Sequence, residues 1–171
     1  MTDRLLGTLL LLLLAWHSAV KLQTGLLPEM AWACHLATAL AAIGLIAGLP
    51  TLTVVGGLFH LTCGLPGWIL EMALNGTTPS SFALHVATPA ASVWAARRHG
   101  VPAWAPVGAA ALWLGSQLLG RLFDPALNIN LAWHPYQVLA VPVWVSHALN
   151  LFLLLTFSTA ATAGARRLGW T

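Results

Sequence analysis

Long apolar runs fill almost the whole chain and are interrupted only by short stretches rich in glycine, proline and polar residues. Hydrophobic residues make up 58% of the sequence, whereas charged residues make up only 6%. A water-soluble globular domain carries roughly 25% charged residues, so this chain lacks the side chains to cover a soluble surface. The sequence therefore predicts an integral membrane protein, and 171 residues leave no room for a separate soluble domain.

Hydropathy, together with breaks at glycine, proline and charged residues, predicts an all-α, polytopic membrane bundle in a single domain, 1–171. The apolar start runs on towards Lys21 without a convincing cleavage site, so we interpret it as an uncleaved first span. The six predicted transmembrane helices cover approximately 4–20, 28–48, 51–74, 81–97, 103–120 and 137–164.

The distribution of basic residues predicts the orientation. Six spans place both termini on one side, and five arginines fall on that side: Arg4, Arg97, Arg98, Arg166 and Arg167. The other side holds Lys21 and Arg121. The positive-inside rule then makes both termini cytoplasmic. Alanine-rich, lysine-poor composition is typical of high-GC bacteria, so we expect a multi-pass protein of the bacterial inner membrane. We expect no nucleic-acid partner.

Ionisable side chains lie inside the apolar segments, where leucine would serve packing alone. The stretch FHLTCGLPGW (59–68) combines an imidazole, a thiol, two glycines and a proline. On each predicted helix the polar residues share one face, and most lie in the outer half of the membrane. An imidazole that faced lipid would be unsatisfied at a cost of several kcal/mol. We therefore predict that imidazoles from separate helices meet in one water-accessible hollow, whereas His17 and His99 are interfacial. The imidazoles in question are His35, His60, His85 and His147.

Two kinds of chemistry fit these residues, and the sequence leaves both open. A hydroxyl or thiol nucleophile needs a base within hydrogen-bond reach, which pairs Thr38, Cys34 or Cys63 with His85 or His35. Donors for a developing oxyanion and other substrate-binding groups would come from a wider set, namely Asn130, Trp133, His134, His147, Asn150 and Glu71. Alternatively, imidazoles suit metal ions and haem, and the ligands would then be His35, His60, His85 and His147.

Several of these residues belong to an ordered series of motifs. In chain order they are ACHLAT (33–38), GLFHLTCGLPGWILEMALNGTTP (57–79), FALHVATP (82–89) and NINLAWHP (128–135). In order and spacing they resemble the YwaF-like bacterial membrane proteins. That group is related to the androgen-induced threonine lipid hydrolases and an ether-lipid transacylase. The resemblance spans roughly residues 30–150.

The resemblance implies a helix bundle with a polar site reached from one leaflet, where a lipid acyl ester is cleaved or transferred. It implies Thr38 as the nucleophile, His85 as the base and His35 as the neighbouring family histidine. In the acyltransferase branch a cysteine takes the place of the threonine. The sequence departs from the family where its usual Asn-Tyr pair reads Asn130-Leu131, and the chain is short for the family.

The leading expectation is a lipid acyl-ester hydrolase or acyltransferase open to the outer leaflet, with a membrane lipid as partner and no cofactor. The first alternative is a histidine-lined protein that binds or transports a metal, haem, a quinone or a small lipid. The second is a structural subunit of a larger membrane complex or a homo-oligomer, to which nine tryptophans would be suited.

Overall fold

The structure, a computed structural model, describes residues 2–134 and 141–171. Every regular element within these ranges is helical, and they contain no strand, which confirms the all-α prediction. The α-helices are α1 (Asp3–Gln23), α2 (Ala33–Ala47), α3 (Pro50–Phe59), α4 (Leu65–Asn75), α5 (Pro79–His99), α6 (Ala105–Gly120) and α7 (Val143–Arg167). Four short turns complete the order: the 3-10 turns η1 (Leu27–Ala31), η3 (Pro125–Leu127) and η4 (Ile129–Leu131), and the π-helical turn η2 (His60–Gly64).

Three helices of the described chain are long and apolar enough to cross a membrane. They are α1, α7 and the continuous helix Pro50–Asn75, which is formed by α3, η2 and α4 and contains 26 residues. Helix α2 is apolar but has only 15 residues. The helices therefore agree with a membrane protein. Each of the six predicted segments contains a helix in the described chain, and three helices have the length and hydropathy of a full span.

Two of the predicted boundaries are wrong. The segment predicted as one helix over 28–48 is divided, because Trp32 is extended (φ −60°, ψ 141°) between η1 and α2. The last helix begins at Val143 and not near residue 137, because its N-cap Pro142 has an extended backbone (φ −58°, ψ 145°). Residues 137–140 of that prediction lie outside the described residues.

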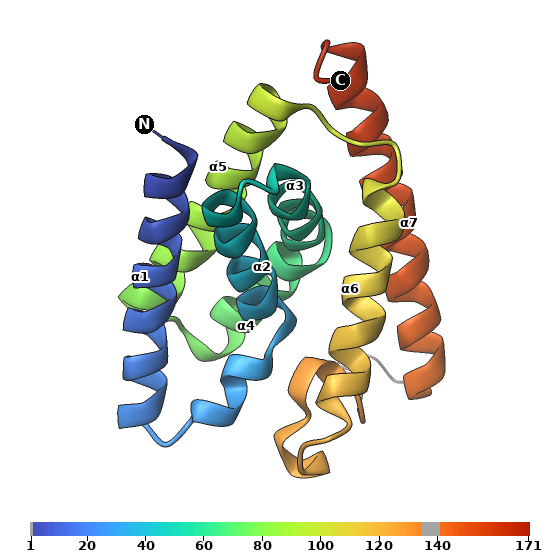
Figure 1. The fold of residues 1–171 in the computed structure, drawn as a ribbon. Helices are drawn as coiled ribbons and strands as arrows, with labels where there is room; N and C mark the ends of the chain where they lie inside the picture. The colour runs from blue at the N-terminus through green and yellow to red at the C-terminus, as the bar shows by residue number, and fades with distance from the viewer. Residues whose placement is uncertain (1, 135–140) are drawn as a thin grey trace.

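The helices form a bundle in which the two chain ends lie at the same end, as Figure 1 shows. We call this the terminal end. The turns η1, η3 and η4 lie at the opposite end, which we call the loop end. Helices α6 and α7 pack side by side, and α2 packs between α1 and α3. This arrangement matches an even number of passes through the bundle.

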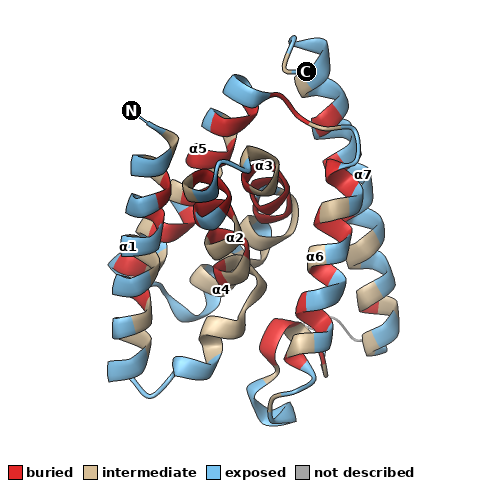
Figure 2. Ribbon diagram, viewed as in Figure 1, coloured by how far each residue is buried: buried red, intermediate tan, exposed pale blue. Residues whose placement is uncertain are grey.

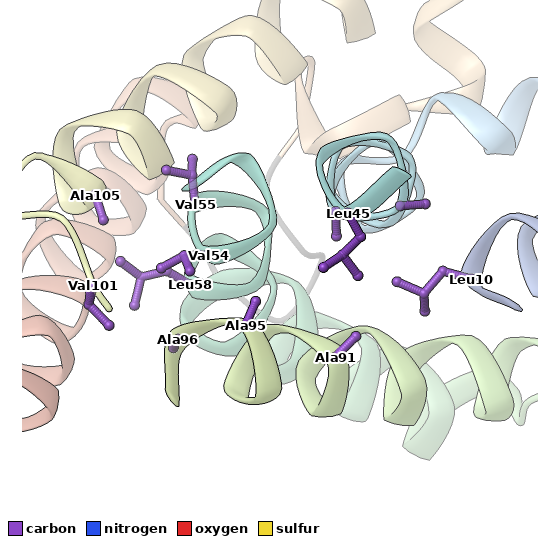
Figure 3. Packing of buried hydrophobic residues seen from close by; sticks show 12 residues of the cluster. Leu10, Leu45, Val54, Val55, Leu58, Ala91, Ala95, Ala96, Val101 and Ala105 are labelled. Carbon is purple, nitrogen blue, oxygen red and sulfur yellow. The ribbon is translucent and has the colours of Figure 1, made fainter. Parts of the chain in front are cut away.

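One of two apolar core clusters lies towards the terminal end, where α1, α2, α3 and α5 pack closely (Figures 2 and 3). It joins Leu10 of α1, Leu45 of α2, Val54 of α3 and Ala95 of α5, each at most 4% exposed. A side chain at Gly7 would place its Cβ 2.7 Å from the Ala42 carbonyl oxygen, so α1 and α2 are in direct backbone contact. The candidate site lies nearer the loop end.

Candidate functional site

Four imidazoles from four helical elements meet in the half of the bundle nearest the loop end. We call them the histidine cluster: His17 of α1, His35 of α2, His60 of η2 and His85 of α5. Ring centroids are 4.9 Å apart for His17 and His35, 6.3 Å for His35 and His85, and 5.0 Å for His60 and His85. All four are at most 6% exposed. The predicted convergence of imidazoles from separate helices is therefore confirmed for His35, His60 and His85.

Close contacts between backbones bring these helices together. The Cβ of any side chain at Gly56 would lie 2.8 Å from the Ala37 carbonyl oxygen of α2, and a side chain at Gly57 would overlap Ser92 of α5. Helix α3 can therefore pack against α2 and α5 only because both positions are glycine. The π-turn η2 follows at once and carries His60 into contact with His85. Such turns inside a helix frequently occur at functional sites.

Backbone carbonyls fix the orientation of two rings of the cluster. His85 Nδ1 lies 2.8 Å from the Ser81 carbonyl oxygen, and His35 Nδ1 lies 3.0 Å from the Glu29 carbonyl oxygen. Because a carbonyl oxygen can only accept a hydrogen bond, each Nδ1 carries the proton and donates it. In the neutral imidazole Nε2 is then the acceptor, as a general base requires.

Trp68 of α4 holds the His85 ring from one face. The two rings are stacked, with centroids 4.6 Å apart and an interplanar angle of 11°. The indole Nε1–H donates to Ser81 Oγ at 3.0 Å, so the same residue that accepts from His85 through its carbonyl also anchors the tryptophan. His85 is thus restrained by a hydrogen bond and a stacked ring. A catalytic base is commonly oriented by a neighbouring group in the same way.

Ring nitrogens of the cluster lack hydrogen-bond partners among the described residues. These nitrogens are Nε2 of His17, Nε2 of His85 and both nitrogens of His60. The Cys34 carbonyl lies near the His60 ring but already accepts from Thr38 Oγ1 at 2.9 Å, and it makes no well-formed bond with the ring. Buried polar groups are nearly always satisfied by protein, water or a ligand. These nitrogens are therefore the hydrogen-bonding capacity that the cluster does not use within the described residues.

A cavity of about 1130 Å³ adjoins the cluster, and we call it the main cavity. Three cluster members, His17, His35 and His85, line it, whereas His60 lies behind them. Polar groups from the loop end complete one part of its wall: Lys21, Glu29, Glu71, Asn75, Thr78 and Ser81. The rest of the wall is mainly apolar and reaches Leu153 and Phe157 of α7. The cavity therefore has a polar part and an apolar part, as an amphiphile requires.

Charged side chains of the main cavity are already paired within the protein. Lys21 Nζ donates to Glu29 Oε2 in an ion pair that joins α1 to η1. Glu71 Oε1 accepts a 2.7 Å bond from Asn75 Nδ2 one turn later in α4. Glu71, predicted as a substrate-binding group, lines the cavity and bonds to no imidazole among the described contacts. The Lys21–Glu29 pair is neutral overall, and Glu71 leaves one formal negative charge on the wall.

The predicted nucleophile, Thr38, does not line the main cavity. It is fully buried, and its hydroxyl donates to the Cys34 carbonyl oxygen and lies 2.8 Å from Thr88 Oγ1 of α5. No hydrogen bond joins Thr38 to His85 or His35 in the described chain. The structure therefore brings the two predicted histidines to the cavity and leaves the predicted hydroxyl behind them, joining α2 to α5.

The alternative nucleophiles Cys34 and Cys63 both line the main cavity. Both are free thiols of intermediate burial. Cys34 precedes His35 in α2, and Cys63 lies in the same π-turn as His60. A thiol is thus nearer to the cavity than the Thr38 hydroxyl.

Asn130 links three parts of the backbone. Its Oδ1 accepts from the Ala33 N–H at 2.6 Å and so caps α2, whose own N-cap Trp32 has no side-chain bond. Its Nδ2 donates to the carbonyl oxygens of Ala31 (3.1 Å) and Ser116 (2.8 Å). The side chain lines the main cavity, but both of its N–H groups are used, so it has no donor left for an oxyanion.

His147 and Trp133 lie apart from the histidine cluster. His147 Nε2 donates to the Leu131 carbonyl oxygen at 3.0 Å, and the ring meets Trp113 edge-on with centroids 5.7 Å apart. His147 lines a separate hollow of about 460 Å³ between α6 and α7. The Trp133 ring lies 5.0 Å below the Arg121 guanidinium. The predicted convergence of His147 with the other imidazoles is therefore not observed.

The remaining two candidates divide between loop and cavity. His134 is exposed, and its carbonyl oxygen accepts from Asn128 Nδ2 at 3.0 Å, which organises the loop after η4. Asn150 of α7 lines the main cavity, as its predicted stripe indicated. Only Asn150 of these two thus reaches the site.

Within residues 2–134 and 141–171, no three His, Cys, Asp or Glu side chains are placed to hold a metal ion, so the metal alternative gains no support from these residues. The proposed ligands His35, His60 and His85 pack as rings against one another, while His147 is elsewhere.

Sequence reasoning missed His17, Trp68 and Ser81. His17 was expected at the interface, but it is 1% exposed, and its Nδ1 lies 3.0 Å from Ser80 Oγ. The helical spacing of Gly7, Leu10 and His17 marks the buried face of α1, so the signal was present. Trp68 and Ser81 are ordinary residue types at unremarkable spacing, and only the packing of α4 against α5 gives them a role.

The chain matches no protein-family model, no curated protein and no solved structure.

Proposed function

We propose that the protein is a membrane-embedded hydrolase or acyltransferase that acts on the acyl ester of a lipid held in the main cavity. One observation supports this most directly: His85 lines a cavity that is polar on one side and apolar on the other, its ring is oriented by a backbone carbonyl, and its buried Nε2 has no partner among the described residues. An ester carbonyl between a polar head and an acyl chain would lie at the boundary between these two parts.

His85 acts as the general base in this proposal. Nε2 takes a proton from water or an acceptor alcohol as that oxygen attacks the ester carbonyl, and it returns the proton to the leaving alkoxide. The acyl group is thereby transferred to water or to the alcohol. Direct attack is favoured over a protein nucleophile because the Thr38 hydroxyl is bonded to the Cys34 carbonyl oxygen and lies outside the cavity.

The test uses purified full-length protein with radiolabelled phosphatidylcholine and lysophosphatidylcholine in mixed micelles, followed by measurement of released fatty acid and acylated alcohol. We expect His85→Gln to lower the rate by about 10²–10⁴-fold, the usual contribution of a general base. His99→Gln is the matched control, since His99 bonds to Asp3 at the terminal end. Equal rates in the two variants, or no turnover by the wild type, would refute the proposal.

Thr38→Val separates the two routes. Direct attack predicts that this variant keeps most of its activity, since its hydroxyl does not reach the cavity. Loss of activity, together with a covalent acyl group on Thr38 in the wild type, would instead establish the nucleophile that the family resemblance implies.

The proposal includes six membrane passes with both termini in the cytoplasm of a bacterium, so that the loop end and the cavity face the outer leaflet. The shared terminal end and the arginines gathered there support this orientation. Alkylation of single cysteines introduced at Thr77 and Thr171, from either side of spheroplasts, tests it.

A second candidate is the binding or transport of a small lipid or quinone without chemistry. It is favoured by one observation: no hydroxyl or thiol is bonded to the His85 ring in the described residues. Retention of lipid by a wild type that releases no fatty acid would support it.

A further inference from the structure

One face of α7 continues the main cavity away from the histidine cluster. Asn150, Leu153, Phe157 and Ala161 all line the cavity, and their spacing places them on a single face of the helix. The face is polar at Asn150 and apolar at the other three positions. At 1.5 Å of rise per residue it extends for about 16 Å along the helix axis.

A further part of the cavity wall belongs to η2, which begins at His60, and to α4. It contributes Leu61, Thr62, Pro66 and Leu70 to the same cavity. Leu61 is 39% exposed and Phe157 is 56% exposed, although both line the cavity. The cavity wall is therefore exposed on the side of the bundle where these two residues lie. In a membrane this side faces the acyl chains of the bilayer.

We infer that this part of the main cavity is a tail groove, defined by Leu61, Leu153, Phe157 and Ala161, which takes the acyl chain of a long-chain lipid ester. The inference rests on the proposed function and specifies its substrate class. The chain enters sideways from the bilayer and lies along α7, while the head group lies in the polar part near Lys21 and Asn75. The ester is then beside His85.

Ala161 ends the groove and sets the chain length that fits. Its small side chain is exposed and makes room for the last methylenes, so a phenylalanine there would shorten the groove without entering the core. Each methylene excluded from an apolar site lowers affinity about fourfold, so loss of two lowers it about fifteenfold. Ala160 is the matched control, since it is exposed on the same helix and does not line the cavity.

The experiment measures equilibrium binding of a chain-length series of alkyl-ether lysophosphatidylcholines, which cannot be hydrolysed, to full-length protein in nanodiscs. In the wild type and in Ala160→Phe, affinity rises with chain length to a common plateau. In Ala161→Phe the plateau is reached at a shorter chain, and the longest ligands bind about tenfold or more weakly. Identical plateaus in all three proteins would overturn the inference.

Hydrolysis of the matching ester series separates this inference from the proposed function. A shifted binding plateau without any hydrolysis would uphold the tail groove and refute the enzyme. Hydrolysis with an unshifted plateau would uphold the enzyme and refute the groove. Circular dichroism and gel filtration of both phenylalanine variants confirm that they are folded before binding is compared.

Discussion

The contact between α3 and α5 can be tested by a single methyl group. In Gly57→Ala the new Cβ would overlap the Cβ and Oγ of Ser92, so one of the two helices must move. Overpacking of this kind costs about 1–3 kcal/mol. Moving Ser92 also disturbs the bond from its Oγ to the carbonyl oxygens of Thr53 (3.1 Å) and Thr88 (2.9 Å), at a further cost of about 1 kcal/mol. Alanine returns up to about 1 kcal/mol through its higher helix propensity.

The net expectation is a loss of about 1–3 kcal/mol in the free energy of unfolding, measured by titration with SDS and tryptophan fluorescence. Gly115→Ala is the control, because nothing lies within 4 Å of the new methyl group, and it should leave stability unchanged or slightly raised. Adding Ser92→Gly to Gly57→Ala removes the overlap and should recover part of the loss. If Gly57→Ala were as harmless as Gly115→Ala, the close approach of α3 and α5 would be wrong, and with it the contact between His60 and His85.

Three further substitutions test individual contacts in the same titration. Asn130→Ala removes the hydrogen bonds to Ala33, Ala31 and Ser116 and should cost about 3 kcal/mol, whereas a cost below 1 kcal/mol would contradict its role as a link. His60→Leu removes two buried nitrogens without partners and should raise stability by about 1–3 kcal/mol; a decrease would show that water or a ligand pairs them. Trp68→Phe keeps a ring over His85 but loses the bond to Ser81, and should cost about 1 kcal/mol; no change would show that this bond is not formed.

Much of the helical arrangement could be predicted because its signals are local. Gly48 and Pro50 mark the turn between α2 and α3, and Thr78 caps α5 through a 3.2 Å bond from the Ser81 N–H. The convergence of His35, His60 and His85 could also be predicted, because a buried imidazole has to avoid lipid and the bundle interior is the one alternative.

Contacts between distant segments could not be predicted. Thr38 and His85 both lie on buried helix faces, but a face some 60° wide includes the cavity wall and the layer behind it, and only the packed structure separates the two. Asn130 has a left-handed backbone (φ 58°). It bonds to Ala33 and Ala31, which precede it by 97 and 99 positions, and no sequence pattern predicts contacts over such a separation. His147 bonds to the carbonyl oxygen of Leu131 and lines the hollow between α6 and α7, away from the cluster.

The two ends of the bundle differ in a way that fits a site needing both rigidity and access. At the terminal end, glycine and alanine bring α1, α2, α3 and α5 into backbone contact, and this packing fixes the helices that carry His17, His35 and His85. At the loop end the same helices line the main cavity, and side-chain bonds such as that of Asn130 join separate segments of the backbone. Helix α7 contributes only the partly buried Ala165 to this packing. If lipids of different chain length occupy the proposed tail groove along α7, the contacts among α1, α2, α3 and α5 that orient the imidazoles would therefore be unchanged.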